Sequence, residues 1–164
     1  MTQRTVPSGH ENSFYSFRLK QLVEQYRAVV ERPNEVDTRW NNGWYERFKH
    51  PVLTRDHIPL TWTYDLNPET NPRLLERMGV NSVFNAGAFE HEGKILLITR
   101  TEGYDRKSFF AFAESENGVD HFRFQPYPLD IPDTDPPTTN MYDMRLVHHE
   151  DGWIYGTFCA ERKD

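Results

Sequence analysis

SVFNAGAF at residues 82–89 and KILLITRTE at residues 94–102 flank the turn residues Glu92-Gly93. Both segments are short and rich in β-branched and aromatic residues, which is typical of strands separated by a glycine-containing turn. The sequence therefore predicts an antiparallel hairpin at this point. Two further segments of the same kind, 109–115 and 122–125, extend the hairpin to four predicted strands.

The strand pattern starts again further along the chain. Residues 126–139 are rich in proline and aspartate, which predicts a long exposed loop. Two more strands are predicted at 142–148 and 153–160, on either side of Asp151-Gly152. The two turns resemble each other, because a His-Glu pair precedes each glycine and an apolar strand follows it. Four strands followed by a restart are typical of β-propeller blades, although an open meander gives the same pattern.

The N-terminal part of the chain has a different character. Apolar residues at helical spacing predict a helix over 13–31. Between 33 and 81 the chain carries prolines interleaved with tryptophans and tyrosines, which predicts ordered irregular chain wrapped over a core, with a short helix at 72–78. We therefore divide the chain into an N-terminal helix and wrapping segment, 1–81, and a strand region, 82–164.

The predicted fold class is all-β: about one and a half blades from the N-terminal part of a propeller, preceded by a helix. So few strands cannot close a ring, and their edges would be unpaired. The chain stops at Asp164, directly after a predicted strand. We therefore expect it to be a piece of a larger protein, with the first blade complete and the second only begun.

Composition narrows the function classes. The chain has 164 residues, of which 14% are aromatic, and a net charge of −6 without basic runs, which argues against nucleic acid as a partner. Its single cysteine, Cys159, excludes a disulfide framework and is expected in the core. The scattered histidines have no ligand spacing, so we expect no metal site. No signal peptide or membrane-spanning run is visible, which predicts a soluble cytoplasmic protein without a membrane partner.

Strand register brings polar residues together if each hairpin closes through a two-residue turn. In the first hairpin, Asn85 would stand directly opposite Arg100. In the second, Asp143 would stand opposite Ala160. The pairing of Asn85 with Arg100 can be interpreted in two ways. It is either part of a polar site or an ordinary cross-strand hydrogen bond, as in many sheets.

The same register places Arg162 opposite Met141, one diagonal step from Asp143, roughly 7–8 Å away. A carboxyl group and a guanidinium at that spacing could flank a sugar bond and a phosphate. The alternative is a plain ion pair between Asp143 and Arg145, which would share a strand face two residues apart.

Six stretches of the chain match motifs of one enzyme family: YDLNPETNP at 64–72, FNAGA at 84–88, DRKSFFA at 105–111, AESENG at 113–118, YDMR at 142–145 and HEDGWIYG at 149–156. In these stretches, and in its N-terminal helix, the chain resembles the phosphorylases of glycoside hydrolase family 130. The resemblance implies a five-bladed β-propeller, more than twice as long as this chain, with the active site in its central cavity.

The resemblance also implies an activity: inverting phosphorolysis of β-1,4-mannosyl-glucose to α-mannose 1-phosphate and glucose, by a glycosyltransferase-type phosphorylase. Inorganic phosphate is the co-substrate and attacks the anomeric carbon itself, so the family needs one carboxylic acid and no cofactor. The mannoside disaccharide and phosphate are the expected partners, in a homo-oligomer. The family's acid falls on Asp143 and acts through a sugar hydroxyl.

The resemblance also assigns phosphate binding and sugar binding, to basic side chains and to one asparagine. The resemblance places phosphate on Arg162 and Lys163, which suits an arginine fork beside a lysine point charge. It places the mannosyl unit on Asn85, Arg100 and Arg106. The alternatives are a phosphorylase or hydrolase for a related β-mannoside, and an inactive truncated fragment that binds sugar. Arg162-Lys163 favours phosphorolysis, because the hydrolase branch lacks phosphate-binding cations.

Overall fold

The computed structural model describes residues 9–40, 42–132 and 135–162. A long helix, α1 (Gly9–Val30), comes first, followed by two short 3-10 helices, η1 (Thr38–Trp40) and η2 (Arg55–His57), and by α2 (Leu60–Thr63). Six strands complete the fold: β1 (Val80–His91), β2 (Lys94–Gly103), β3 (Ser108–Ser115), β4 (Arg123–Phe124), β5 (Thr138–His148) and β6 (Ile154–Arg162).

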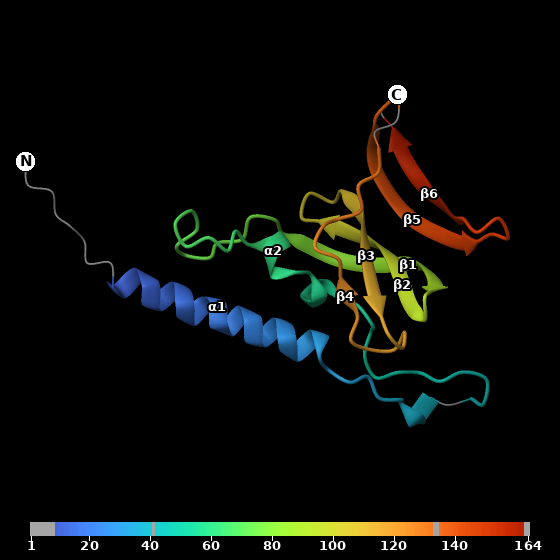
Figure 1. Ribbon diagram of the computed structural model, residues 1–164, viewed down its shortest axis with the longest axis horizontal. Helices are drawn as coiled ribbons and strands as arrows, with labels where there is room; N and C mark the ends of the chain where they lie inside the picture. Colours follow the sequence, from blue (N-terminus) through green and yellow to red (C-terminus); the bar gives the residue numbers. More distant parts are fainter. Residues whose placement is uncertain (1–8, 41, 133–134, 163–164) are drawn as a thin grey trace, which may run out of the picture.

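The strands form two antiparallel sheets. Strands β1, β2, β3 and β4 lie in chain order in a four-stranded sheet, and β5 pairs with β6 in a separate hairpin. Strand β5 packs against β1, β2 and β3, so the hairpin lies over one face of the larger sheet (Figure 1). The prediction of a mostly β chain with a preceding helix is confirmed.

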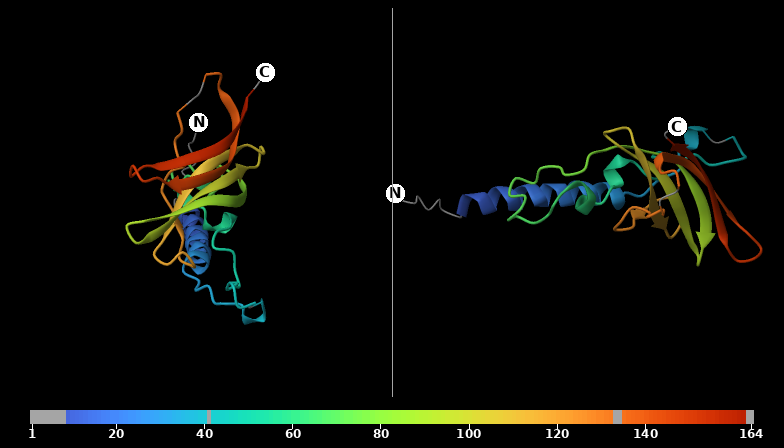
Figure 2. Two further views of the ribbon diagram at one scale, coloured as in Figure 1. Left: turned by 90° about the vertical axis from the view of Figure 1, so that its right-hand side faces the viewer. Right: turned by 90° about the horizontal axis from the view of Figure 1, so that it is seen from above.

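Helix α1 projects away from the sheets, as Figure 2 shows. Its buried face is narrow: Tyr15 and Leu22 pack with Tyr64 and Leu74 of the following segment. The predicted helix at 72–78 is wrong. Leu74 has a φ of 47°, and Glu76 forms a β-bridge with Tyr64, so this segment turns back on α2 instead of continuing a helix. Among the described helices, none is long and apolar enough to cross a membrane.

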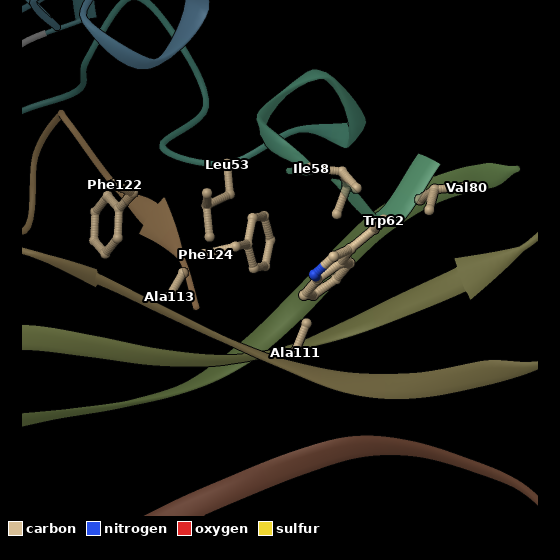
Figure 3. Close-up of a cluster of buried hydrophobic side chains, with 8 residues drawn as sticks. All are labelled: Leu53, Ile58, Trp62, Val80, Ala111, Ala113, Phe122 and Phe124. Atoms are coloured by element: carbon tan, nitrogen blue, oxygen red, sulfur yellow. The ribbon is translucent and has the colours of Figure 1, made fainter. Parts of the chain in front are cut away.

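A compact hydrophobic cluster fills the other face of the larger sheet (Figure 3). Trp62 of α2 stacks at a tilt against Phe109 and Phe124, and its indole N–H donates to the carbonyl of Pro126. Ala111 and Ala113 of β3 are fully buried beneath this ring system. The small β3 side chains leave room for the aromatic rings, which bury large areas.

The first hairpin has the predicted turn but only part of the predicted register. Glu92 and Gly93 have φ angles of 51° and 78°, as a type I′ turn requires, and the pairing runs regularly from the turn to Ala86 opposite Thr99. Beyond this point the register shifts. Phe84 and Asn85 together face Arg100 in a β-bulge, so Asn85 shares the position that was predicted for it alone.

In the second hairpin the predicted register is wrong. The pairing starts at His148 opposite Ile154, because residues 149–153 form a longer connection closed by hydrogen bonds from the His149 amide to the Trp153 carbonyl and from the Gly152 amide to the His149 carbonyl. A second register shift lies between Tyr142 and Arg145. Asp143 is therefore in a bulge facing Phe158 and not opposite Ala160.

The same shifts move the end of the hairpin. Arg162 lies opposite Thr138 and not opposite Met141, so the predicted diagonal contact with Asp143 is absent. Cys159 is exposed in this structure, contrary to the prediction that it belongs to the core, because the outward side of β6 is uncovered within the described residues.

Candidate functional site

Arg100 is the centre of the polar cluster on the face of the sheet that β5 covers. Its Nη2 lies 3.3 Å from the Glu102 carboxylate, and its Nη1 lies 3.7 Å from the Asp143 carboxylate. Its Nε donates to the Ser108 hydroxyl at 3.0 Å. Three directions of the guanidinium are thus taken by groups from β2, β3 and β5.

Two aromatic rings make cation–π contacts with the same guanidinium. The Phe84 ring centroid lies 4.9 Å from the Arg100 Cζ atom and the Tyr142 centroid lies 5.0 Å from it. Arginine over an aromatic face is attracted by the ring quadrupole, and its planar group stacks well. Phe84 reaches Arg100 because the β1 bulge places it there, and Tyr142 comes from β5. The cluster therefore joins the two sheets.

Asp143 enters the cluster from an unusual backbone position. Its φ of 60° lies in the left-handed region, which aspartate tolerates better than most residues, and it is part of the β5 bulge. Such bulges re-aim a side chain and are frequent beside functional sites. The Asp143 side chain is 40% exposed, so it can meet a ligand while it faces Arg100.

The predicted ion pair between Asp143 and Arg145 is not the one that forms. The bulge ends the simple alternation of faces, and Arg145 is exposed and donates from Nη1 to the carbonyl of Met144 at 3.0 Å. The cation that meets Asp143 is Arg100, which lies on another sheet. Periodicity within one strand cannot reveal such a partner.

Glu102 is a buried member of the cluster that the sequence did not single out. It accepts a hydrogen bond from Asn81 Nδ2 at 2.8 Å and lies 3.5 Å from Arg106 Nη1, in addition to its contact with Arg100. Its residue is 5% exposed. A signal was present, since an acidic residue two positions after Arg100 on an apolar strand shares the face of that arginine.

Arg106 belongs to the connection between β2 and β3. Its φ is 65°, and its side chain is 79% exposed apart from the contact with Glu102. The connection is closed by the Gly103 amide, which donates to the Lys107 carbonyl. Next to it, the Ser108 amide donates to Asn140 Oδ1 at 2.8 Å, which ties the connection to β5. Asn85 is exposed on the neighbouring bulge.

Arg162, one of the two residues predicted to bind phosphate, lies at the far end of the hairpin from its turn. Arg162 is exposed at the end of β6, four residues beyond Phe158, which faces the Asp143 bulge. At about 3.3 Å per residue this is roughly 13 Å along the strand. Lys163 lies outside the described residues, so the structure places only one of the two predicted cations.

The charges of the cluster balance. Arg100 and Arg106 carry two positive charges, and Glu102 and Asp143 carry two negative charges. The Glu161 carboxylate beside Tyr142 raises the pKa of its hydroxyl, which keeps that group neutral. With Glu161 beside Tyr142, the site carries no excess of positive charge. Its directed donors and acceptors, with aromatic surface beside them, suit an uncharged polyhydroxyl ligand better than a free anion.

Comparison with known proteins relates the chain to a curated enzyme. No protein-family model matches the chain. The chain is 53% identical over 152 residues, or 93% of its length, to a 4-O-β-D-mannosyl-D-glucose phosphorylase from Bacteroides fragilis. It spans 39% of the length of that curated relative.

Proposed function

We propose that this chain is part of an inverting glycoside phosphorylase that cleaves β-1,4-mannosyl-glucose with inorganic phosphate. The single observation that carries the proposal is the 53% identity to a mannosyl-glucose phosphorylase over 93% of the chain. The cluster around Arg100 supports it, because a charge-balanced set of donors and acceptors beside aromatic rings suits a sugar. The β1–β4 sheet would be a first propeller blade and the β5–β6 hairpin the start of a second.

The reaction needs little from the protein beyond positioning and one proton. A phosphate oxygen attacks the anomeric carbon of the mannosyl unit while the bond from that carbon to the glucose oxygen breaks. The glucose oxygen takes up a proton, and glucose leaves. The mannosyl unit is now bonded to phosphate with inverted configuration at its anomeric carbon, as α-mannose 1-phosphate. An inverting hydrolase needs a second carboxylate to activate the attacking water. Here phosphate is itself the nucleophile, so that second carboxylate is not required.

Asp143 is the proposed source of that proton, through a sugar hydroxyl. The Arg100 guanidinium lies 3.7 Å from its carboxylate. In the acid role, the substrate has to replace this contact with its own. If the pair stays closed, Asp143 is instead the acceptor for a mannosyl hydroxyl.

The substitution Asp143→Asn separates these two roles. Loss of a general acid lowers kcat by about 10²–10⁴-fold with little change in KM. Loss of a hydroxyl acceptor raises KM for the disaccharide while kcat changes less. Steady-state kinetics, measured in a chimera of this chain with the remainder of the Bacteroides fragilis enzyme, decide between the two roles. Kinetics within a few-fold of the unsubstituted chimera would exclude both.

The other proposed contacts are with the sugar and the phosphate. Asn85, Arg100 and Arg106 would bind the mannosyl unit, and Arg162 with Lys163 would bind phosphate. The roughly 13 Å between the Asp143 bulge and Arg162 leaves room for a sugar ring and a phosphate between them. Arg162→Ala should raise KM for phosphate and lower kcat, because the fork also orients the attacking oxygen. Superimposable phosphate-dependence curves would contradict this role.

A chimera tests the function directly. The segment of the Bacteroides fragilis enzyme that this chain matches is replaced by the chain itself, and the product is incubated with mannosyl-glucose with and without phosphate. We expect mannose 1-phosphate and glucose only when phosphate is present. Free mannose without phosphate would indicate the hydrolase alternative. A chimera that melts cooperatively yet releases neither product from any β-mannoside of a panel would overturn the proposal.

A further inference from the structure

We propose that Glu102 is a positioning residue that holds Arg100 and Arg106 in the orientation in which they meet the ligand. The identity of the ligand, a mannosyl unit, rests on the proposed function. The orientation itself rests only on the geometry around Glu102.

The Glu102 carboxylate is a shared acceptor at the centre of the cluster. It faces three nitrogen donors at once: Asn81 Nδ2 at 2.8 Å, Arg100 Nη2 at 3.3 Å and Arg106 Nη1 at 3.5 Å. An ionised carboxylate offers about four lone-pair sites, so it can serve all three. The Glu102 side chain is only 7% exposed, so these groups and not water satisfy its charge.

Arg100 and Arg106 each depend on Glu102 for their orientation, in different ways. The Arg100 side chain is 23% exposed and has several acceptors within reach. Its contact with Glu102 through Nη2 leaves Nη1 directed at Asp143. Arg106 is 79% exposed on a connection between strands. A free arginine of this kind samples many rotamers, and ordering it on ligand binding costs entropy. The Glu102 contact reduces that cost in advance.

Glu102 itself is screened from a ligand by the residues that it binds. Its carboxylate is enclosed by Asn81, Arg100 and Arg106, whereas Asp143 and Arg106 are open to solvent. Glu102 therefore acts through the arginines, and its removal should weaken sugar binding without removing a group that reacts.

The decisive measurement is made on this chain without substrate. Arginine Nε–Hε cross-peaks in a ¹H–¹⁵N NMR spectrum report side-chain order, and Arg100→Lys and Arg106→Lys spectra assign the two peaks. In the parent chain we expect both peaks to be dispersed. Glu102→Gln should move the Arg106 peak to the position of a free arginine and shift the Arg100 peak. Glu90→Gln, an exposed change in the same sheet, should leave both in place.

Glu102→Asp guards against a Gln variant that does not fold. It keeps the negative charge but shortens the side chain, so we expect peaks between the parent and free positions. Arginine peaks that stay unchanged in whichever variant retains the parent amide spectrum would overturn the proposal. If neither variant keeps that spectrum, Glu102 is a folding residue and the proposal is equally wrong.

The chimera supplies a kinetic check that separates this inference from the proposed function. Glu102→Gln should raise KM for mannosyl-glucose roughly 10-fold, the effect of losing a charge-assisted hydrogen bond, and leave KM for phosphate unchanged. Glu102→Asp should restore part of the loss. An active chimera whose KM for the disaccharide does not respond contradicts the inference. A parent chimera that melts cooperatively but is inactive counts against the proposed function, and the NMR result on the chain then decides the role of Glu102.

Discussion

Asp143 and Arg106 both have left-handed backbone conformations although neither is glycine. Strained backbone of this kind costs free energy and is concentrated where a side chain must point in a particular direction. Asp143 lies in the bulge of β5, and Arg106 lies in the connection between β2 and β3. Leu74, Glu92 and His121 have positive φ as well, but of these residues only Asp143 has it at a bulge within a strand, where it directs the side chain toward Arg100.

Gly87 controls how closely β5 approaches β1. A Cβ at this position would lie 2.8 Å from Leu146 Cγ and 3.2 Å from the Met144 carbonyl, next to the Asp143 bulge. Gly87→Ala should therefore destabilise the chain by about 1–3 kcal/mol, the usual effect of overpacking, because backbone as well as a side chain must move.

Urea unfolding measures this difference, with Gly156→Ala as the matched control. A Cβ on Gly156 would meet only side-chain atoms of Leu146 and Met144, the nearest at 3.3 Å and none of them backbone, so that change should cost much less. Equal effects of the two substitutions would mean that the approach at Gly87 is not tight.

His57 gives the fold a pH dependence. Burial, and secondarily the charge of Arg32, lowers the pKa of His57 below its ordinary 6.5. The Thr54 amide donates to Nδ1 at 3.0 Å, which requires the neutral ring. Because the unfolded chain binds the proton more tightly, the stabilisation is complete above pH 6.5 and is lost as pH falls toward the folded pKa.

The free energy of unfolding should therefore fall between about pH 7.5 and about pH 5.5, and His57→Gln should reduce that slope. His148→Gln, at an exposed position, provides the control. Identical slopes for the parent chain and His57→Gln would show that His57 does not contribute.

At the scale of elements, the two sheets differ in protection. Strand β3 lies between β2 and β4 and contains the fully buried Ala111 and Ala113, whereas most of β6 is exposed and pairs only with β5 among the described strands. Amides of β6 should exchange with deuterium much faster than those of β3, since local opening exposes little apolar surface there. Similar protection of the two strands would contradict the separate-hairpin arrangement.

The elements were largely predictable from the sequence, and their register was not. Segments rich in β-branched and aromatic residues are recognisable as strands. Glu92 and Gly93 both adopt positive φ angles and so form a tight turn. In the second hairpin, Asp151 Oδ1 accepts the Trp153 amide at 2.9 Å, within a longer connection. A side-chain hydrogen bond that lengthens a turn in this way does not change the alternation of apolar and polar residues in the strands, so the register could not be predicted from that alternation.

The sequence singled out most members of the polar cluster around Arg100, but not Glu102 and not the contacts among them. Asn85, Arg100, Arg106 and Asp143 were singled out, and Arg100 and Asp143 do meet, but through bulges that periodicity cannot locate. Both the pairing of Arg100 with Asp143 and its stacking on Tyr142 depend on how β5 crosses β1, β2 and β3. Contacts between sheets are decided by packing over the whole molecule, so strand-level reasoning missed them.

At the scale of the whole molecule, the β5–β6 hairpin presents apolar surface to solvent. Val147, Trp153 and Tyr155 are 58%, 71% and 50% exposed. Such a patch beside an unprotected strand edge favours association. Sedimentation velocity should show the chain associating as its concentration rises, and Val147→Lys should weaken this. A strictly monomeric chain at all concentrations would contradict the prediction.

The central claim is that the cluster around Arg100 binds the mannosyl unit. The most direct test is a crystal structure of the chimera with α-mannose 1-phosphate bound. We predict that the sugar hydroxyls lie within hydrogen-bond distance of Asp143 and Arg106, with Asn85 beside them and the phosphate directed along β6 toward Arg162. Sugar density at another place, with this cluster unoccupied and the ion pair between Arg100 and Asp143 unchanged, would contradict the claim.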